Sequence, residues 1–305
     1  MNPVYSRHLS RFLVLALVST AGAGCSLKTM AVNTVADTLS ETGSVFTRDD
    51  DPELIKDAIP FALKFYESIL ESAPRHQGLL LATCNAFTSY GALLQADADQ
   101  ARAKDYELSV ALEDRALRLY LRGRDFCMRA FDVRSKGIAD RLAADATAAV
   151  APLTKDDVPL LYWTAASWGS AIALAPDRPD LLIDFPTVRA LIDRALALDE
   201  AWSRGAIHEA LITIESLETL GGTPDKAREH FRRAVELQKG LSPGPYVALA
   251  TGVVQNAQDR AEFEKLLKQA LAIDPAKSPD SQLVTIITQR RAKSLLDNID
   301  SLIAR

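Results

Sequence analysis

Residues 223–239 read TPDKAREHFRRAVELQK, and they contain both the start and the apolar stripe of one helix. The Thr-Pro pair that begins at Thr223 is typical of an N-cap followed by the first helical position. Ala227, Phe231 and Ala234 are spaced by four and three residues, so they share one helix face. Small residues on either side of an aromatic ring allow a second helix to approach closely. The stretch therefore predicts a helix that packs against a neighbouring helix.

The same stripe of small and aromatic residues occurs earlier in the chain. Ala116, Tyr120 and Gly123 repeat it with identical spacing, and Ala62 with Tyr66 forms a partial copy. Because the stripe recurs in segments of helical composition, we expect several helices that pack in the same manner.

Three helix ends also resemble one another. The segments ALALDE, AVELQ and ALAIDP begin at Ala195, Ala234 and Ala270, so their leading alanines are 39 and 36 residues apart. This spacing is close to the tetratricopeptide period of about 34 residues, although the first helix of each repeat lacks the regular signature. We predict an all-α, tetratricopeptide-like α-solenoid of antiparallel helix pairs. It has about four degenerate repeats and a C-terminal capping helix over residues 281–304.

Composition limits the classes of function. The chain is 48% hydrophobic and 25% charged, which is sufficient for a large folded core. Its formal net charge is −5 and its pI is about 5.5. An acidic protein offers no basic field to a phosphate backbone, so we expect no nucleic-acid partner.

Residues 1–24 have the parts of an export signal: a basic start, an apolar run at 12–18 and a small-residue stretch. The apolar run is shorter than the roughly 20 residues that span a bilayer. Small residues followed by Cys25 resemble the lipobox of bacterial lipoproteins, in which the cysteine is acylated and becomes the first residue. Ser26 in place of aspartate favours sorting to the outer membrane. The alternative is an ordinary signal peptide cleaved near Ala23.

The mature chain divides into a tether and a folded domain. Residues 25–50 are polar and have no sustained period, so we predict a lipid-anchored tether with at most one short helix. The tetratricopeptide-like domain is predicted over residues 51–305. It starts with Asp51 as an N-cap, Pro52 at the first helical position and Glu53 in the first turn. We interpret the acidic run that ends at Asp51 as a cap rather than a weak cation site.

Two cysteines remain in the folded domain, Cys84 and Cys127. An oxidising periplasm permits a disulfide. However, helices over 77–97 and 105–132 with a turn near Gln100 would separate the two thiols by roughly 15 Å along the hairpin. This exceeds the separation that a disulfide tolerates, so we predict two buried free thiols.

The sequence carries no common catalytic motif: it has no nucleophile elbow and no glycine-rich loop for nucleotides. His208 and Glu209 begin like a zinc-protease helix, but Ile212 stands where the second histidine would be needed. We interpret His76 and His230 as ordinary surface histidines. We therefore expect no catalytic residue, no metal site and no cofactor.

Aromatic residues form the first candidate binding site. Tyr162, Trp163 and Trp168 lie in one predicted helix, and Phe87 and Tyr90 lie in a preceding helix that could face the same cavity. Two interpretations remain open. The rings can be core packing, or they can line a site for a ligand or a partner segment, where large rigid aromatics are favoured.

Arginines near the end of one predicted helix form the second candidate site. They are Arg122, Arg124, Arg129 and Arg134. Such a cluster can bind a carboxylate, a phosphate or an acidic partner. The alternative is a set of cations at a helix C-terminus, neutralised by Asp125 and Asp132.

Residues 160–174 read LLYWTAASWGSAIAL. This run resembles the hallmark helix of the TatT family, the T-component of certain tripartite ATP-independent periplasmic (TRAP) transporters. The segments 258–275 and 289–296 are similar to the C-terminus of that family. The resemblance covers residues 29–303, and it includes the Tyr-Trp-x4-Trp-Gly pattern that generic tetratricopeptide proteins lack.

The resemblance implies a non-enzymatic periplasmic lipoprotein that forms a homotrimer and docks the transporter's solute-binding P-component. It also implies that a small hydrophobic or carboxylated ligand passes through or beside the helical body. The family supplies no catalytic residues to assign to this chain. The alternative function is a tetratricopeptide lipoprotein scaffold for cell-envelope or outer-membrane assembly.

Overall fold

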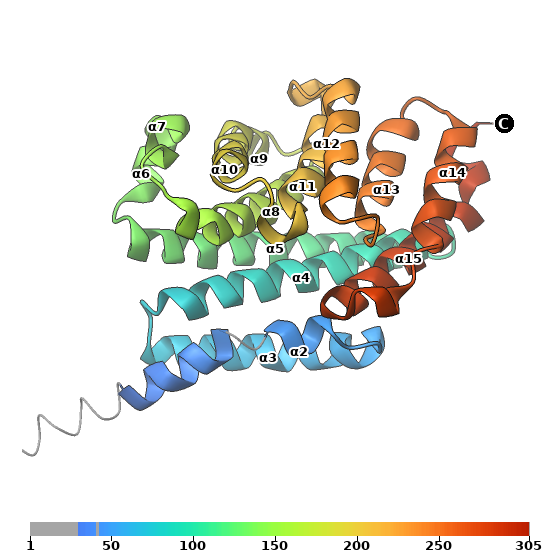
Figure 1. Cartoon of the computed structure of the whole chain (residues 1–305). Coiled ribbons are helices and arrows are strands. Elements are labelled where there is room, and N and C mark those ends of the chain that lie inside the picture. The colour runs from blue at the N-terminus through green and yellow to red at the C-terminus, as the bar shows by residue number, and fades with distance from the viewer. Residues whose placement is uncertain (1–29, 41–42, 305) are drawn as a thin grey trace, which may run out of the picture.

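A computed structural model describes residues 30–40 and 43–304, and in these ranges the chain is helical, with no strand (Figure 1). Residues 30–40 form the first helix. The helices that follow are α2 Gly43–Thr47, α3 Pro52–Ser72, α4 Gln77–Ala101, α5 Tyr106–Arg134, α6 Ile138–Ala144, α7 Ala146–Val150, α8 Val158–Leu174, α9 Pro179–Leu182, α10 Phe185–Leu198, α11 Ala206–Glu215, α12 Pro224–Leu237, α13 Gly244–Leu249, α14 Arg260–Leu271, α15 Gln282–Asp297 and α16 Ile299–Leu302. The predicted all-α class is confirmed.

The long hairpin of α4 and α5 lies between α3 and the later helices (Figure 1). Its two helices approach closely because each has a glycine at the contact. A Cβ at Gly91 would lie 2.9 Å from the ring of Tyr120, and one at Gly123 would lie 2.9 Å from the Thr88 hydroxyl. Ala116 is fully buried in the same interface. The predicted stripe of small and aromatic residues is therefore confirmed as a packing surface.

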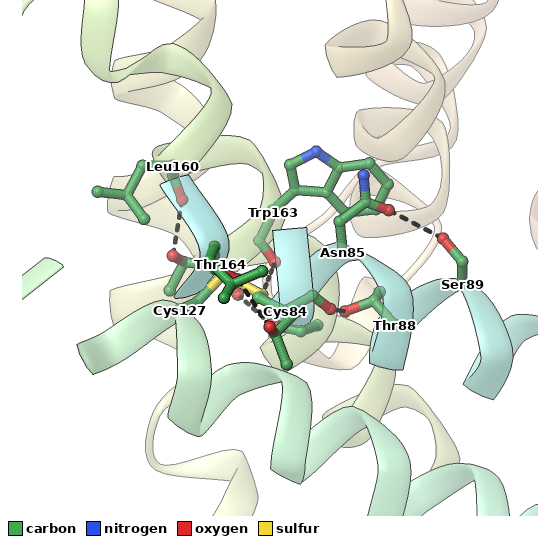
Figure 2. The surroundings of a disulfide bond; sticks show 11 residues. Cys84, Asn85, Thr88, Ser89, Cys127, Leu160, Trp163 and Thr164 are labelled. Carbon is green, nitrogen blue, oxygen red and sulfur yellow. Dashed lines mark hydrogen bonds between the residues drawn. A yellow bond between two sulfur atoms is a disulfide. The ribbon is translucent and has the colours of Figure 1, made fainter. Parts of the chain in front are cut away.

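A disulfide joins Cys84 of α4 to Cys127 of α5, with 5.3 Å between their Cα atoms (Figure 2). The prediction of two free thiols is wrong because the hairpin turns at residues 102–105, later than expected. Cys84 lies 17 residues before Ala101, and Cys127 lies 21 residues after Tyr106. The four-residue difference corresponds to an offset of about 6 Å, which a disulfide can span.

Helix α8 packs onto this cross-linked hairpin. The Cys84 sulfur lies 3.9 Å from the main-chain oxygen of Trp163, and Figure 2 shows Trp163 and Thr164 beside the disulfide. The buried Thr164 hydroxyl donates to the Leu160 carbonyl one turn earlier at 2.6 Å, so it needs no partner outside its own helix. The helix with the aromatic run thus rests on a covalently closed support.

Both predicted N-caps are confirmed. The Asp51 carboxylate accepts from the main-chain N–H groups of Glu53 and Leu54 at 3.0 and 3.1 Å. The Thr223 hydroxyl accepts from the N–H of Lys226 at 3.4 Å. Each cap satisfies donors that the first turn of a helix leaves free.

The alanines of the repeated segments lie in the core. Ala195, Ala227, Ala234 and Ala270 are all fully buried. The last three belong to an apolar cluster formed mainly by α12 to α16, whereas Ala195 belongs to the larger cluster of the preceding helices. The alanines therefore pack as the sequence predicted.

Part of the segment predicted as a tether is helical and packs on the folded domain. Residues 30–40 form a helix in which Ala36 is fully buried. Asp37 contacts His76 at 3.1 Å, and His76 also caps α4 by accepting from the N–H of Leu79 through Nδ1. His76 therefore joins two helices, in contrast to its interpretation as an ordinary surface residue.

The C-terminal helices do not simply cover the end of a stack. Helix α15 contacts α2, α3 and α4, and Figure 1 shows it in red beside the blue N-terminal helices. Arg290 pairs with Glu53 and Arg291 with Asp99, both at 2.8 Å. The segment predicted as one capping helix thus links the two ends of the described chain.

Candidate functional site

Helix α8 is fixed at its start by a buried carboxylate. Asp157 accepts from Arg134 at 2.6 and 3.1 Å and from the N–H of Thr154 at 2.9 Å. Burial opposes ionisation of Asp157, but these hydrogen bonds outweigh it and lower the pKa of its carboxyl group. Arg134, one of the four predicted arginines, therefore positions the first turn of α8.

Three aromatic rings meet near the middle of α8. The Tyr162 ring lies 5.2 Å from the Trp163 ring and 4.7 Å from the ring of Trp202, which belongs to the 3₁₀ turn before α11. All three side chains are half-buried, so each keeps some exposed surface. Trp168 is not part of this contact; it lies beneath Arg124, and its indole N–H is buried without an acceptor among the described residues.

The two aromatic residues predicted from α4 lie inside the hairpin. The Phe87 ring stacks on Phe126 at 5.5 Å, and the Tyr90 hydroxyl accepts from Arg115 at 3.2 Å. Both are buried, so their direct contacts are to the α4–α5 interface.

The predicted arginines do not converge on one point. Three of the guanidinium groups each cover a different ring: Arg122 covers Phe87 at 4.8 Å, Arg124 covers Trp168 at 5.4 Å, and Arg129 covers Phe126 at 5.1 Å. Arg122 is also paired with Glu67, and Arg124 with Asp125. The predicted arginines therefore lie apart from one another, and most of them are paired with a carboxylate. Asp132, the other expected partner, instead accepts from the main chain.

Sequence analysis missed a carboxyl group near the aromatic cluster. Glu209 of α11 is half-buried, and it accepts from the Gln238 amide at 2.9 Å. Burial raises the pKa of Glu209, and burial together with the charge of Glu209 raises the pKa of Tyr162. A Cβ at Gly244 would lie 1.9 Å from Oε1 of Glu209, so the glycine leaves the room that this carboxyl occupies. The sequence gives one indication of this position: Glu209 lies three residues before Ile212, which is buried, so the two share one side of α11.

A histidine pair lies between α11 and α12. Nδ1 of His208 is 2.9 Å from Nδ1 of His230, and Nε2 of His208 is 3.4 Å from Glu200. His208 is buried, and His230 is half-buried rather than the ordinary surface residue that the sequence suggested. Burial lowers the pKa of both rings. Nowhere in the described ranges do three His, Cys, Asp or Glu side chains gather in a way that could hold a metal ion.

The structure thus defines an all-helical protein whose candidate site combines half-buried aromatic rings with one carboxyl group. The chain matches the family of TRAP transporter T-components over residues 48–303, and it belongs to this family. It is also 28% identical over 294 residues to an uncharacterized protein of Treponema pallidum (strain Nichols), covering 90% of this chain and 91% of that protein. The resemblance seen in the sequence is confirmed.

Family membership associates the chain with a TRAP transporter as an accessory component. In the ranges that the structure describes, no helix is both long and apolar enough to cross a membrane. The predicted signal peptide and Cys25 lie outside the described residues.

Proposed function

We propose that the chain is a non-enzymatic periplasmic scaffold that docks the solute-binding P-component of a TRAP transporter. The match to the T-component family over residues 48–303 carries this proposal. Successive helices pack against each other, including α4 with α5, α11 with α12 and α13 with α14. We propose that such pairs form a tetratricopeptide-like solenoid, an architecture that offers extended surfaces to partner proteins.

The scaffold is anchored through Cys25 in this proposal. The small residues before Cys25 and the Ser26 after it support acylation and sorting to the outer membrane. Acyl chains contribute about 0.8 kcal/mol per buried CH₂, so two or three of them hold a protein stably in a bilayer. Labelled palmitate should enter the natural chain and not Cys25→Ala. Equal labelling of both chains would refute the anchor.

The proposal includes a homotrimer, and α3 offers a surface for it. Leu54, Phe61 and Phe65 share one outer stripe of this helix and are 56%, 76% and 41% exposed. The two phenylalanine rings stack on each other at 6.1 Å. Exposed apolar patches of this kind mark interaction sites, and we assign the stripe to contacts between copies of the chain.

The site for a small ligand or a partner segment is proposed on α8. Tyr162, Trp163 and Trp168 each keep exposed surface, as a wall residue requires. Phe87 and Tyr90 lie inside the cross-linked hairpin on which α8 packs, and Arg122, Arg124 and Arg129 cover aromatic rings. Large rings lose little conformational entropy on binding and are therefore suited to such a surface.

Affinity purification from cells tests the docking. The full chain carries a C-terminal tag, is cross-linked in the envelope and is purified beside an unrelated tagged lipoprotein as the control. We expect the solute-binding component of a TRAP transporter to be enriched with this chain and not with the control. Enrichment of cell-wall or outer-membrane assembly proteins instead would refute the proposal and favour the assembly scaffold.

A further inference from the structure

We infer that the exposed face of the first helix, residues 30–40, lies on the surface of the lipid bilayer to which the chain is tethered. The inference rests on the proposed function, because it needs the lipid anchor at Cys25. It goes beyond that anchor by naming a surface of the folded chain that contacts lipid. It therefore also names the side of the protein that faces the membrane.

The inner side of this helix is fixed to the folded domain. Ala36 is fully buried, and Leu39 packs against the larger apolar core. Tyr66 of α3 donates to the Leu39 carbonyl at 3.4 Å, and Asp37 contacts His76, the N-cap of α4, at 3.1 Å. Rotation of the helix about its axis would break these contacts, so its outer side is defined. Figure 1 shows the helix in dark blue at the lower edge of the molecule.

The outer side of the helix consists of uncharged residues. With 3.6 residues per turn, five exposed residues cover an arc of about 140° opposite Ala36. They are Met30, Ala31, Thr34, Val35 and Thr38. The two large side chains, Met30 and Val35, are 62% and 43% exposed. Asp37 lies at the edge of this arc, where it contacts His76.

Both threonines of the arc satisfy their hydroxyl donors within the helix. The Thr34 hydroxyl donates to the Met30 carbonyl at 3.0 Å, and the Thr38 hydroxyl donates to the Thr34 carbonyl at 2.9 Å. These O–H groups therefore need no donor contact with water. A face with no charge and with satisfied hydroxyl donors loses little when it moves from water to the interfacial region of a bilayer.

The length of the connecting chain keeps this face beside the bilayer. Met30 follows Cys25 by five positions. An extended chain spans at most about 3.6 Å per residue, so the two Cα atoms are no more than about 18 Å apart. The acyl chains of a lipidated cysteine enter the hydrocarbon, which holds the cysteine itself near the headgroups. Lys28 is the one charged side chain between Cys25 and Asp37, so this connection presents no carboxylate to the lipid phosphates.

The size of the arc favours lipid over a second copy of the chain as its partner. A stable protein interface buries about 800 Å² on each partner. An 11-residue helix is about 16 Å long and about 10 Å wide, so one side of it covers far less than this area. A small apolar face is sufficient next to a lipid anchor, because the anchor already holds it at a high effective concentration beside the membrane.

A thiol-reactive fluorophore tests the contact. Cys25 is acylated in the proposal and Cys84 is joined to Cys127, so an introduced cysteine is the one free thiol. Val35→Cys is labelled with NBD maleimide, and the full-length lipoprotein is reconstituted in vesicles of phosphatidylcholine and phosphatidylglycerol. The matched control is Ile183→Cys, at a 77% exposed apolar residue directly after α9. Helix α9 lies on the other side of the α4–α5 hairpin (Figure 1). The natural chain, which should not be labelled, is the blank.

We expect the Val35 probe to emit at shorter wavelength in vesicles than the Ile183 probe. Lipids with a doxyl group near the headgroup should quench the Val35 probe at least about twofold more strongly, because interfacial helices are immersed by about 5–10 Å. Iodide in the water should instead quench the Ile183 probe more strongly. Thr34→Cys lies on the same arc and should behave like Val35→Cys. Circular dichroism and thermal melting establish that each labelled variant is folded.

Equal quenching of the Val35 and Ile183 probes by doxyl lipids would overturn the inference. A Val35 probe shielded from both doxyl lipids and iodide would also overturn it, and would show that a second copy of the chain covers the helix. Equal palmitate labelling of Cys25→Ala and the natural chain would remove the anchor and this inference together. A palmitate-labelled chain without doxyl quenching removes this inference alone, and the docking experiment is independent of the probes.

Discussion

Loss of the Cys84–Cys127 disulfide should lower the free energy of unfolding by about 4 kcal/mol. The bond closes a loop with a sequence separation of 43 residues. The loop-closure entropy that a cross-link of this length removes from the unfolded chain corresponds to about 4 kcal/mol at 25 °C. Both cysteines are fully buried between α4 and α5, so the folded packing changes little when the bond is opened.

Urea unfolding followed by far-ultraviolet circular dichroism measures this loss, with and without reductant. For a urea dependence of about 3 kcal/mol per molar, the midpoint should fall by about 1.3 M on reduction. The double variant Cys84→Ala/Cys127→Ala is the control: it should unfold near the reduced midpoint and be insensitive to reductant. Two alkylatable thiols in the denatured, unreduced protein would refute the reasoning, as would a midpoint that reductant does not move.

Three further predictions concern charge and surface. Glu215→Gln should lower the free energy of unfolding by about 1–3 kcal/mol, measured in urea, because Glu215 is fully buried and pairs with Arg189 at 2.7 Å. His208 and His230 have lowered pKa values, so the unfolded chain binds protons more readily; thermal stability should fall as the pH drops below about 6.5. Phe61→Ser should shift the native mass spectrum from the proposed trimer towards monomer, since Phe61 is 76% exposed.

Each of these predictions has a matched control. Glu264→Gln removes a more exposed carboxylate that is paired with Lys268 and Arg260, so it should destabilise the fold less than Glu215→Gln does; an equal loss for both glutamates would contradict the burial argument. His208→Gln should flatten the loss of stability between about pH 6.5 and pH 5; an unchanged profile would show that other groups cause it. A trimer unaffected by Phe61→Ser would remove α3 from the subunit contact.

The packing of individual helices could be predicted from the sequence because its causes are local. Helical spacing places Ala116 and Tyr120 on one face whatever surrounds the helix, and both prove to be buried. The caps at Asp51 and Thr223 depend on a side chain and the next few main-chain donors. Such features follow from the period of the helix and from short-range hydrogen bonding.

Features that depend on where segments meet could not be predicted in the same way. The hairpin turns at residues 102–105 rather than near Gln100. A later turn lengthens the first arm and shortens the second, so an error in the position of the turn changes the predicted offset between two residues by twice that error. This error hid the disulfide between Cys84 and Cys127. The contact of α15 with the N-terminal helices could not be predicted either, because no repeating pattern in the sequence indicates it.

The candidate site was predicted in part. The Tyr-Trp run of α8 identified Tyr162 and Trp163, whereas Trp202 comes from a later segment that the fold brings beside Tyr162. Glu209 occupies space that is free because residue 244 is glycine, and no local pattern reveals such a pairing. Contacts between residues 35 to 40 positions apart along the chain, such as these, require the tertiary structure.

Native mass spectrometry of the purified chain, mixed with the solute-binding component of a TRAP transporter, tests the proposed scaffold function most directly. We predict a complex at micromolar concentrations in which each copy of this chain holds one copy of the solute-binding component. Separate masses for the two proteins at those concentrations, with both shown to be folded, would contradict a docking role.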